Sequence, residues 1–461
     1  MFFGIFYAEI RTPPEPGPEF TAREACLRIA VKSAAKSPKG GFGGIGKIER
    51  ASENFEGAQG LDIWFYAKNS PAISRGEAVE GKFIVRKAED DGGGFYKYLK
   101  SRNVYFKAYS AEEIQIEPAG FPHSLYNKIR AYIEGKLSPC VCGESLKRGM
   151  GAMRAMFLGD KSALDAEAKD GFKLTGTMHI FAISGLHVGL LAAIIFMLLS
   201  PARLPAKAKP AISLPILFLY VNACGAPPSA MRAFIMIATV WISSVFGRKP
   251  KPFAGLAAAF AISLLINPSS LFDAGFALSY SVVAAIILYA GDLCEFLRGK
   301  FAGARGFELK NPGLLRRAAL KCQDLLVAGA CIALAAIIAS APLCSCYFGY
   351  VPLMSVFYSI PFVLGATFAV SCAAASAVLP AFLCAWTNAA GAFILEIMLR
   401  LAKFGASYGF VLSAKISPEA AFLAEAATIA AMLLAPQIKS PLRWLAPPAV
   451  SALAILTAFI F

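Results

Sequence analysis

Hydrophobic and polar positions divide the chain into two parts with different patterns. From about Leu27 to Ala111, short runs of β-branched and aromatic residues are separated by Gly- and Pro-containing segments. This pattern is typical of β-strands joined by turns. We expect strands near residues 27–34, 61–68, 81–88 and 104–111. Four or five short strands within about 90 residues favour a small closed barrel.

The second part, from Met178 to Phe461, is a series of apolar runs. Each run is roughly 17–25 residues long, which suits a helix that crosses a hydrocarbon core of about 30 Å. The pattern predicts a polytopic α-helical membrane protein with about ten spans. We expect these spans at residues 178–199, 211–225, 229–246, 253–267, 272–291, 324–347, 352–378, 381–402, 418–436 and 443–461.

Three domains follow from these patterns. Residues 1–118 are expected to form an OB-like β domain and residues 178–461 the transmembrane domain. Between them, residues 119–177 show apolar positions on one helical face and Lys or Arg on the other, which predicts amphipathic helices in the membrane interface. The chain is 57% hydrophobic and 16% charged, a composition that also favours a membrane protein.

The formal net charge of +15 is unevenly distributed. Residues 1–135 contain 19 Lys and Arg against 17 Asp and Glu, so net charge alone does not predict DNA binding by the β domain. The excess lies in loops between spans, about 15 basic residues on one side and about three on the other, and the basic side is expected to be cytoplasmic. The β domain then lies on the outer face of the membrane.

Four sequence elements occur in order between residues 157 and 281. They read FLGDK from Phe157, TGTMHIFAISGLHVGL from Thr175, GAPPSAMRA from Gly225 and NPSSLFDAGFALSY from Asn267. Together they resemble the signature of the ComEC-type competence family. The segment GFYKYLKSRNV from Gly94 is similar, more loosely, to part of the OB-like domain of that family.

The resemblance implies an inner-membrane, multi-pass channel that takes up single-stranded DNA during natural transformation. Implied partners are the DNA strand, membrane lipids, a separate nuclease and a cytoplasmic motor, and a homo-oligomer is left open. Several positions depart from the family pattern: Lys251 and Ala254 stand in place of an Asp and an Asn, Ala277 stands in place of a glutamine, and an Asn expected before Ile360 is absent.

Histidine is too rare here for a metal-dependent nuclease. Many family members end in a metallo-β-lactamase-like domain with an HxHxDH motif, whereas this chain has three histidines, His123, His179 and His187. A zinc site would need further Cys or His ligands, and neither Cys140 with Cys142 nor Cys344 with Cys346 has them nearby in the sequence. We therefore expect no catalytic residues, metal ion or cofactor.

The first predicted span supplies several candidate site residues. His179 and His187 are eight positions apart, about 12 Å along an unbroken helix, which is too far for one metal ion. Ser184 and His187 share a helical face, and Gly185 with Gly189 forms a GxxxG pattern that permits close helix packing. A tight helix crossing and a polar pore lining are both compatible with this composition.

A second group of candidates lies near the starts of two other spans. Arg232 and Ser229 share a face, and a buried Arg needs a partner or water. Either Asp273, in a fixed ion pair, or a passing phosphate fits that requirement. Asp273 and Ser279 begin a span that contains Gly275, so backbone groups there are candidates for contact with cargo.

The aromatic residues of the β domain have two interpretations. They belong either to the barrel core or to a face on which single-stranded DNA stacks. The candidates are Trp64, Phe65, Tyr66, Tyr105 and Phe106.

Two other functions remain as alternatives. One is an integral-membrane hydrolase that uses Ser184, His187 and either Asp160 or Asp273, although a Ser and a His three residues apart make an awkward nucleophile–base pair. The other is a small-solute transporter, for which the span pattern shows no inverted repeat.

Overall fold

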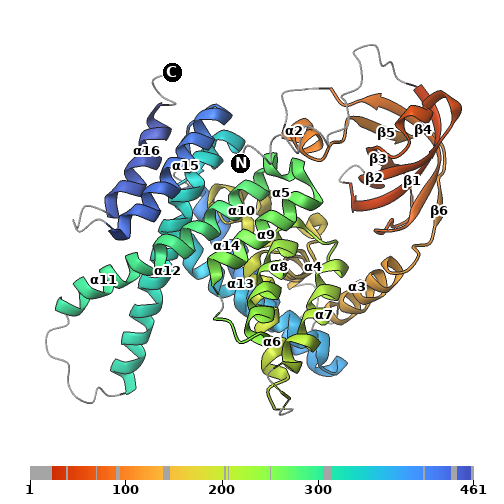
Figure 1. Ribbon diagram of the computed structural model, residues 1–461. Coiled ribbons are helices and arrows are strands. Elements are labelled where there is room, and N and C mark those ends of the chain that lie inside the picture. The colour runs from red at the N-terminus through yellow and green to blue at the C-terminus, as the bar shows by residue number, and fades with distance from the viewer. Residues whose placement is uncertain are drawn as a thin grey trace.

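The computed structural model describes residues 23–37, 40–68, 70–89, 94–138, 146–201, 204–205, 207–249, 251–304, 314–408, 411–437 and 444–457. Within them, a small β-barrel lies at one end of a larger bundle of helices (Figure 1). The apolar N-terminal patch and the Cys140–Cys142 pair lie outside the described residues.

Five strands close the barrel and a sixth extends it. Strand β1 pairs with β2 and β4, β2 pairs with β3, β3 pairs in parallel with β5, and β5 pairs with β4. The turn η1 (Glu53–Ala58) precedes β3, and helix α2 (Gly94–Ser101) separates β4 from β5. The OB-like barrel is therefore confirmed. Its strands are β1 (Arg23–Lys36), β2 (Phe42–Ala51), β3 (Asp62–Ala67), β4 (Ala78–Lys87), β5 (Phe106–Ser110) and β6 (Gln115–Glu117).

Strand β2 was not among the four strands expected from the sequence. Three glycines in it depress strand propensity, but packing requires two of them. A Cβ at Gly44 would collide with the Ser33 backbone, and one at Gly46 would collide with the Ile29 side chain. The glycines therefore permit β1 and β2 to approach closely where the barrel curves.

Each of the ten predicted apolar segments contains a helix. The segment that begins with α10 continues through a π-helical turn, η6 (Ile286–Ala290), into α11 (Gly291–Ala304). The helices of the ten segments are α6 (Gly185–Leu198), α7 (Ala208–Ala223), α8 (Pro228–Val245), α9 (Pro252–Ile266), α10 (Ala274–Ala285), α12 (Leu314–Phe348), α13 (Ser355–Val378), α14 (Ala381–Ser407), α15 (Pro418–Leu434) and α16 (Ala446–Thr457).

Within the described residues, five stretches are long and apolar enough to cross a membrane. The helical membrane class is confirmed, while the count of about ten spans stays a prediction, because the other apolar helices are shorter. The five stretches are Pro228–Val245, Ala274–Gly299, Ala319–Phe348, Ser355–Val378 and Ala381–Ser407.

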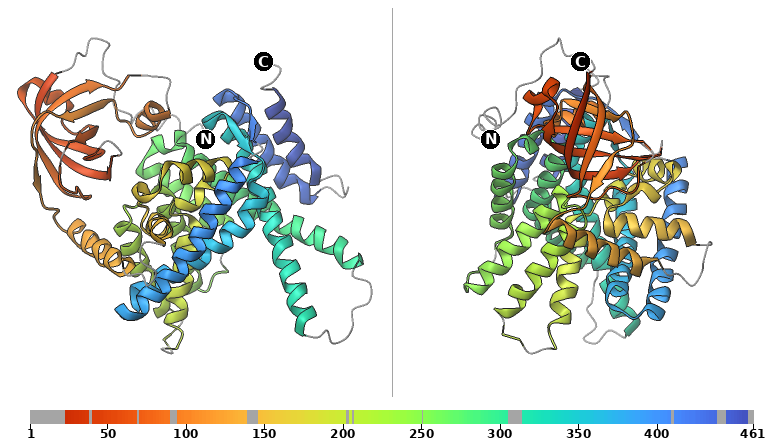
Figure 2. Two further views of the ribbon diagram at one scale, coloured as in Figure 1. Left: turned by 180° about the vertical axis from the view of Figure 1, so that it is seen from behind. Right: turned by 90° about the vertical axis from the view of Figure 1, so that its right-hand side faces the viewer.

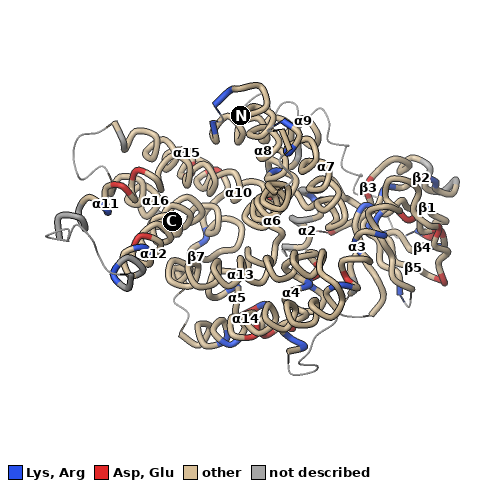
Figure 3. The backbone as a smooth tube through the Cα atoms, turned by 90° about the horizontal axis from the view of Figure 1, so that it is seen from below, with Lys and Arg blue, Asp and Glu red and all other residues tan. Residues whose placement is uncertain are grey.

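The long helices α12, α13 and α14 pack in sequence across the bundle (Figure 2). Charged positions are sparse along the helices and gather in the barrel and near helix ends (Figure 3). A short sheet of β7 (Tyr350–Pro352) and β8 (Val411–Ser413) joins the α12–α13 turn to the α14–α15 connection.

The three helices between the barrel and α6 contact the bundle itself. They are α3 (His123–Leu137), α4 (Lys147–Leu158) and α5 (Ala166–Leu174), and the turn η3 (Lys161–Ala163) follows α4. The last eight residues of α4 include seven that are buried, and Gly149 meets the Ala392 backbone of α14. An amphipathic surface helix therefore does not describe α4, because neighbouring helices cover it on several sides. The location of the three helices relative to the membrane interface stays a prediction.

Helix α6 begins later than the predicted span. Residues Met178–Phe181 form a 3₁₀ turn, η4, and Ala182 and Ser184 are extended. His179 and His187 therefore do not lie on one unbroken helix, and the helical distance expected between them does not apply. The remaining short turns are η5 (Pro268–Phe272) and η7 (Ala435–Gln437).

Candidate functional site

Ser184 and His187 form the start of α6. Ser184 is the N-cap, and its backbone N–H lies 3.5 Å from His187 Nδ1, which completes a capping box. An accepting Nδ1 requires the neutral ring with its proton on Nε2. The spacing of three residues therefore serves the helix terminus, and Nδ1 faces the backbone of Ser184 instead of its hydroxyl. This orientation disfavours the hydrolase alternative.

The first turn of α8 binds the segment that precedes α6. Ser229 Oγ donates to the carbonyl oxygen of Ile183 at 2.7 Å and so attaches the segment before α6 to the first turn of α8. A Cβ at Gly185 would lie 3.6 Å from the Ala233 side chain, an ordinary contact, whereas one at Gly189 would meet no atom within 4 Å. The expected close packing is thus absent at Gly189 in the described bundle.

Arg232 is the most deeply placed cation of this region. Arg232 is 4% exposed, and its Nη2 donates to the Gly275 carbonyl oxygen at 3.0 Å. The guanidinium lies 5.1 Å from the centre of the Tyr280 ring and 5.6 Å from that of Phe276. Nε and Nη1 have no hydrogen-bond partner among the described residues. Two strong donors are therefore buried without an acceptor, an uncommon arrangement.

Asp273 serves two other groups. One carboxylate oxygen accepts the Phe276 N–H at 3.0 Å, so Asp273 is the N-cap of α10. The other lies 3.8 Å from Arg102 Nε, at the end of barrel helix α2. Among the described residues no ion pair joins Asp273 to Arg232, so the fixed pair considered for them is wrong. The N-cap geometry directs the carboxylate toward the barrel.

The other candidates lie around these residues. His179 is exposed in η4, where its Nδ1 is 3.2 Å from the Gly176 carbonyl oxygen, and it is near enough to His187 for their charges to interact. Ser279 is half-buried on α10, one turn after Gly275. Gly275 contributes its carbonyl oxygen to Arg232 and does not act as a packing notch.

The barrel sorts its aromatic residues into two groups. Phe65 and Phe106 are buried in the core, so the core interpretation is right for them. Trp64 and Tyr66 alternate with the buried positions of β3 and face outward. Their rings stack at 6.3 Å, nearly parallel.

Two further aromatic residues join this outward group and were missed from the sequence. Tyr109 of β5 is opposite Tyr66, and its ring lies 5.6 Å from that of Trp64. Phe95 of α2 packs edge-on against Trp64 at 5.5 Å. The alternation of β5 could have revealed Tyr109, but Phe95 comes from a helix whose placement depends on the closed barrel. We name Trp64, Tyr66, Phe95 and Tyr109 the aromatic face.

Basic side chains border the aromatic face. Lys107 Nζ lies 5.3 Å above the Phe95 ring, and Lys107 is opposite Trp64 on β3 and Arg86 on β4. Arg86 is exposed. Aromatic rings beside two cations can stack bases and attract phosphates, as in proteins that bind single strands.

A family model described as Competence protein matches residues 156–440. The chain belongs to the competence protein family. It is 30% identical to ComE operon protein 3 of Bacillus subtilis (strain 168) over 199 residues, 42% of this chain and 24% of that protein. It is also 30% identical to Competence protein ComA of Neisseria gonorrhoeae over 173 residues, 34% and 25% of the two chains. The matches thus span about a quarter of each relative's length. No solved structure matches the chain.

All four sequence elements of this competence protein lie inside the matched region. The structure brings three of them together, since Ser229 binds the element that contains Ser184 and Arg232 binds the element that contains Gly275. Arg102 of the barrel contacts Asp273 in the last of these elements.

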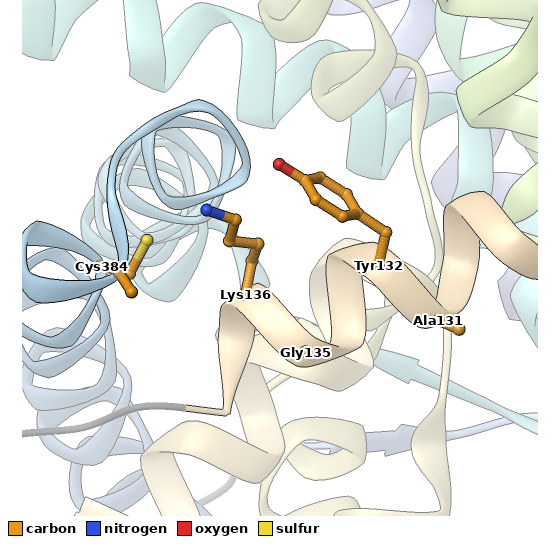
Figure 4. Close-up of a pocket in the computed structure, with 6 residues that line it drawn as sticks. Ala131, Tyr132, Gly135, Lys136 and Cys384 are labelled. Atoms are coloured by element: carbon orange, nitrogen blue, oxygen red, sulfur yellow. The ribbon is translucent and has the colours of Figure 1, made fainter.

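A cavity between α3 and α14 has about 310 Å³ of volume (Figure 4). Two of the polar groups around it are already engaged, since Lys136 Nζ donates to the Leu379 carbonyl oxygen at 2.9 Å and Tyr132 Oη to that of Ala377 at 3.1 Å. These bonds satisfy the last carbonyls of α13. The cavity therefore belongs to the attachment of α3 to the bundle and offers little to a ligand.

Proposed function

We propose that this competence protein is a channel that passes single-stranded DNA across the bacterial inner membrane, with the barrel on the outer face. Membership of the competence family supports a role in DNA uptake during transformation. The observation that carries the channel proposal is Arg232, whose guanidinium keeps two unpartnered donors inside an apolar bundle.

A phosphate group suits those donors. Burial of an unpaired cation among membrane helices costs several kcal/mol unless an anion or water compensates. The Gly275 carbonyl oxygen, the two rings and the Asp273 carboxylate, which lies beyond ion-pair distance, compensate only part of the charge. Each phosphate of a passing strand would supply charge-assisted bonds and then leave, which matches the weak, repeated binding that conduction requires.

The aromatic face is the proposed first contact of the strand. Base stacking on aromatic side chains does not depend on sequence, as uptake of arbitrary DNA requires. Helix α2 carries both Phe95 of this face and, at its end, the Arg102 contact to Asp273. A strand on the barrel would therefore lie next to the helix ends that hold Arg232.

The proposal assigns no covalent chemistry to the chain. Degradation of the other strand and the driving force would come from a separate nuclease and a cytoplasmic motor. Purified protein is then expected to cleave no DNA with any divalent metal ion.

The orientation is tested with reporter fusions. A reporter near Lys310 should read as cytoplasmic and one near Tyr350 as external. The opposite pair of results would place the barrel on the inner face and contradict the proposal.

The channel is tested by substitution of Arg232. Arg232→Gln should leave normal amounts of protein in the membrane while entry of labelled DNA falls about 10- to 100-fold, since a charge-assisted hydrogen bond contributes roughly 1.5–3 kcal/mol. Arg232→Lys should retain part of the uptake, because Lys binds phosphate as a point charge. Membrane abundance and DNA entry are measured on the same cells.

A matched control is Lys321→Gln. Lys321 also lies on a membrane helix, α12, but its side chain is exposed. Its loss should leave uptake unchanged. Normal uptake by Arg232→Gln at normal abundance, or equal losses for the two variants, would show that Arg232 is no part of a DNA path. The combination Arg232→Gln with Asp273→Asn should also stay inactive, because no ion pair joins the two residues.

A further inference from the structure

Glu425 is a second buried ionisable group, on α15, which contacts α10 as the Arg232 helix α8 does. It lies two turns into α15 and is 7% exposed, its carboxyl group has no ion-pair partner among the described residues, and the Ser281 hydroxyl of α10 lies beside it. Helix α15 packs against α10, α12 and α16 (Figure 1). The carboxyl group is thus enclosed by four helices, including its own.

The groups near Glu425 are neutral. Ser281 of α10 and Cys344 of α12 lie beside it, and the described part of α16 has no charged residue. No cation lies within ion-pair distance of Glu425 in the described part of the chain. Glu396 on α14 provides a contrast, because its Oε1 lies 3.5 Å from Arg400 Nε.

This environment selects the protonation state. An ionised carboxylate without a partner in an apolar bundle costs many kcal/mol, so the group takes up a proton instead. A protonated carboxyl has only ordinary hydrogen-bonding demands, which Ser281 and Cys344 are placed to meet. Glu396 differs, because Arg400 lies within ion-pair distance of its carboxylate.

Polar groups occur along α12 between Glu425 and the end of the bundle that faces the barrel. Ser340, Cys344 and Tyr347 share one face of α12, at positions i, i+4 and i+7. Cys344 is near Glu425, and Tyr347 is near Asp273. Asp273 in turn is 18% exposed and meets Arg102 of the barrel.

Helix α10, which contacts the helices of both Arg232 and Glu425, continues into an irregular turn. The π-helical turn η6 follows Ser281 within the span that α10 begins. Such turns occur often at functional sites, because a small shift in helical register repacks them. A shift of α10 would change the surroundings of Ser281 and of Gly275 together.

We propose that Glu425 is a proton-binding site inside the membrane domain, which exchanges its proton with water at the barrel end of the bundle past Cys344 and Tyr347. In the exchange, the carboxyl O–H bond breaks, the proton passes to a water molecule and a carboxylate remains, and the reverse step restores the acid. The site does not depend on the passage of DNA.

Infrared spectroscopy of the full-length protein in phospholipid vesicles tests this site. At neutral pH the protein should show the carbonyl band of a protonated carboxyl group, and the band should shift when H₂O is replaced by D₂O. Glu425→Gln should remove the band, and Glu425→Asp, which keeps the acid if Gln impairs folding, should shift it. Glu396→Gln is the matched control and should leave the band unchanged.

Two results would overturn the proposal. One is a band that survives in Glu425→Gln, and the other is a Glu425 band that does not respond to D₂O. The route is tested by Tyr347→Phe, which removes only a hydroxyl and should slow the D₂O shift several-fold. An unchanged rate would exclude the path past Tyr347. These readouts are independent of DNA uptake, so they succeed or fail separately from the channel.

Discussion

The barrel and the helical bundle place their charged side chains differently. In the barrel, Arg28 bridges Glu49 and Glu117, and Lys32 pairs with Asp62, all on partly exposed side chains over an apolar core. In the bundle, ionisable side chains are few, but several are interior. These are His187 (as a neutral ring), Arg232, Glu396 and Glu425.

The difference follows from the solvent around each part. Water hydrates any charge on the barrel surface, so ion pairs there contribute little and need no function. Lipid hydrates no charge, so a charge in the middle of a membrane helix turns inward, where it is paired, neutralised or used, while one near a helix end can extend to the interface. In the bundle, buried ionisable groups therefore indicate function. In the barrel, the feature that indicates function is the aromatic face.

The largest effect is expected from truncation of the barrel core. Phe83 is fully buried, and Phe83→Ala should reduce the free energy of unfolding of the barrel by about 3–5 kcal/mol. Phe362→Ala in the bundle, at an equally buried site, should cost less, because lipid is as apolar as the helix interior and only packing is lost. Denaturant titrations followed by Trp64 fluorescence for the barrel and by circular dichroism for the helices measure the two losses. Equal losses would contradict the distinction between the two solvents.

Trp64→Ala tests the aromatic face. Loss of one stacking ring should weaken binding of a single-stranded oligonucleotide by about 1–3 kcal/mol. Because Trp64 also packs against a buried cluster that includes Leu99 of α2, the folded fraction of the variant is checked by circular dichroism. Fluorescence anisotropy of a labelled oligonucleotide measures the affinity. The control is Phe121→Ala, an aromatic residue 85% exposed but outside the face. If both variants lose affinity equally, the face has no special role.

The stability of the protein is expected to depend on pH through His123, where the barrel joins α3. Burial, and then the charge of Arg75, lower the pKa of His123 from its usual 6.5. As the pH falls through 6.5, the unfolded chain binds a proton that the folded chain resists, so stability decreases below that pH and is unaffected above it. Melting temperatures measured between pH 8 and pH 5 should fall less for His123→Asn. A wild-type decrease that persists unchanged in the variant would assign it to other groups.

The smallest effect is expected from a surface ion pair. Lys32 Nζ lies 2.6 Å from Asp62, but its side chain is 51% exposed. Lys32→Ala should change the free energy of unfolding by about 0.2–1 kcal/mol, and less at high salt. Urea denaturation at two salt concentrations checks this. A loss of several kcal/mol would show that barrel charges are as consequential as those of the bundle.

Much of the fold could be predicted from local pattern. Short runs of β-branched and aromatic residues marked four of the barrel strands, and each of the ten apolar runs contains a helix, because both signals depend on neighbouring residues. Strand β2 was missed because its glycines look like a turn until β1 packs against them. The count of spans could not be settled either, since several apolar helices are shorter than a membrane requires.

The sequence by itself determined the two-part architecture, the family elements and the residue types of the candidate site. Only the tertiary structure decided what those residues contact: Asp273 meets Arg102 of the barrel instead of Arg232, and His187 caps its own helix. It also revealed Glu425, an unremarkable residue in an apolar run until three helices enclose it. The physical reason is that hydrophobicity and propensity act along the chain, whereas the partner of a charge depends on which distant segments pack around it.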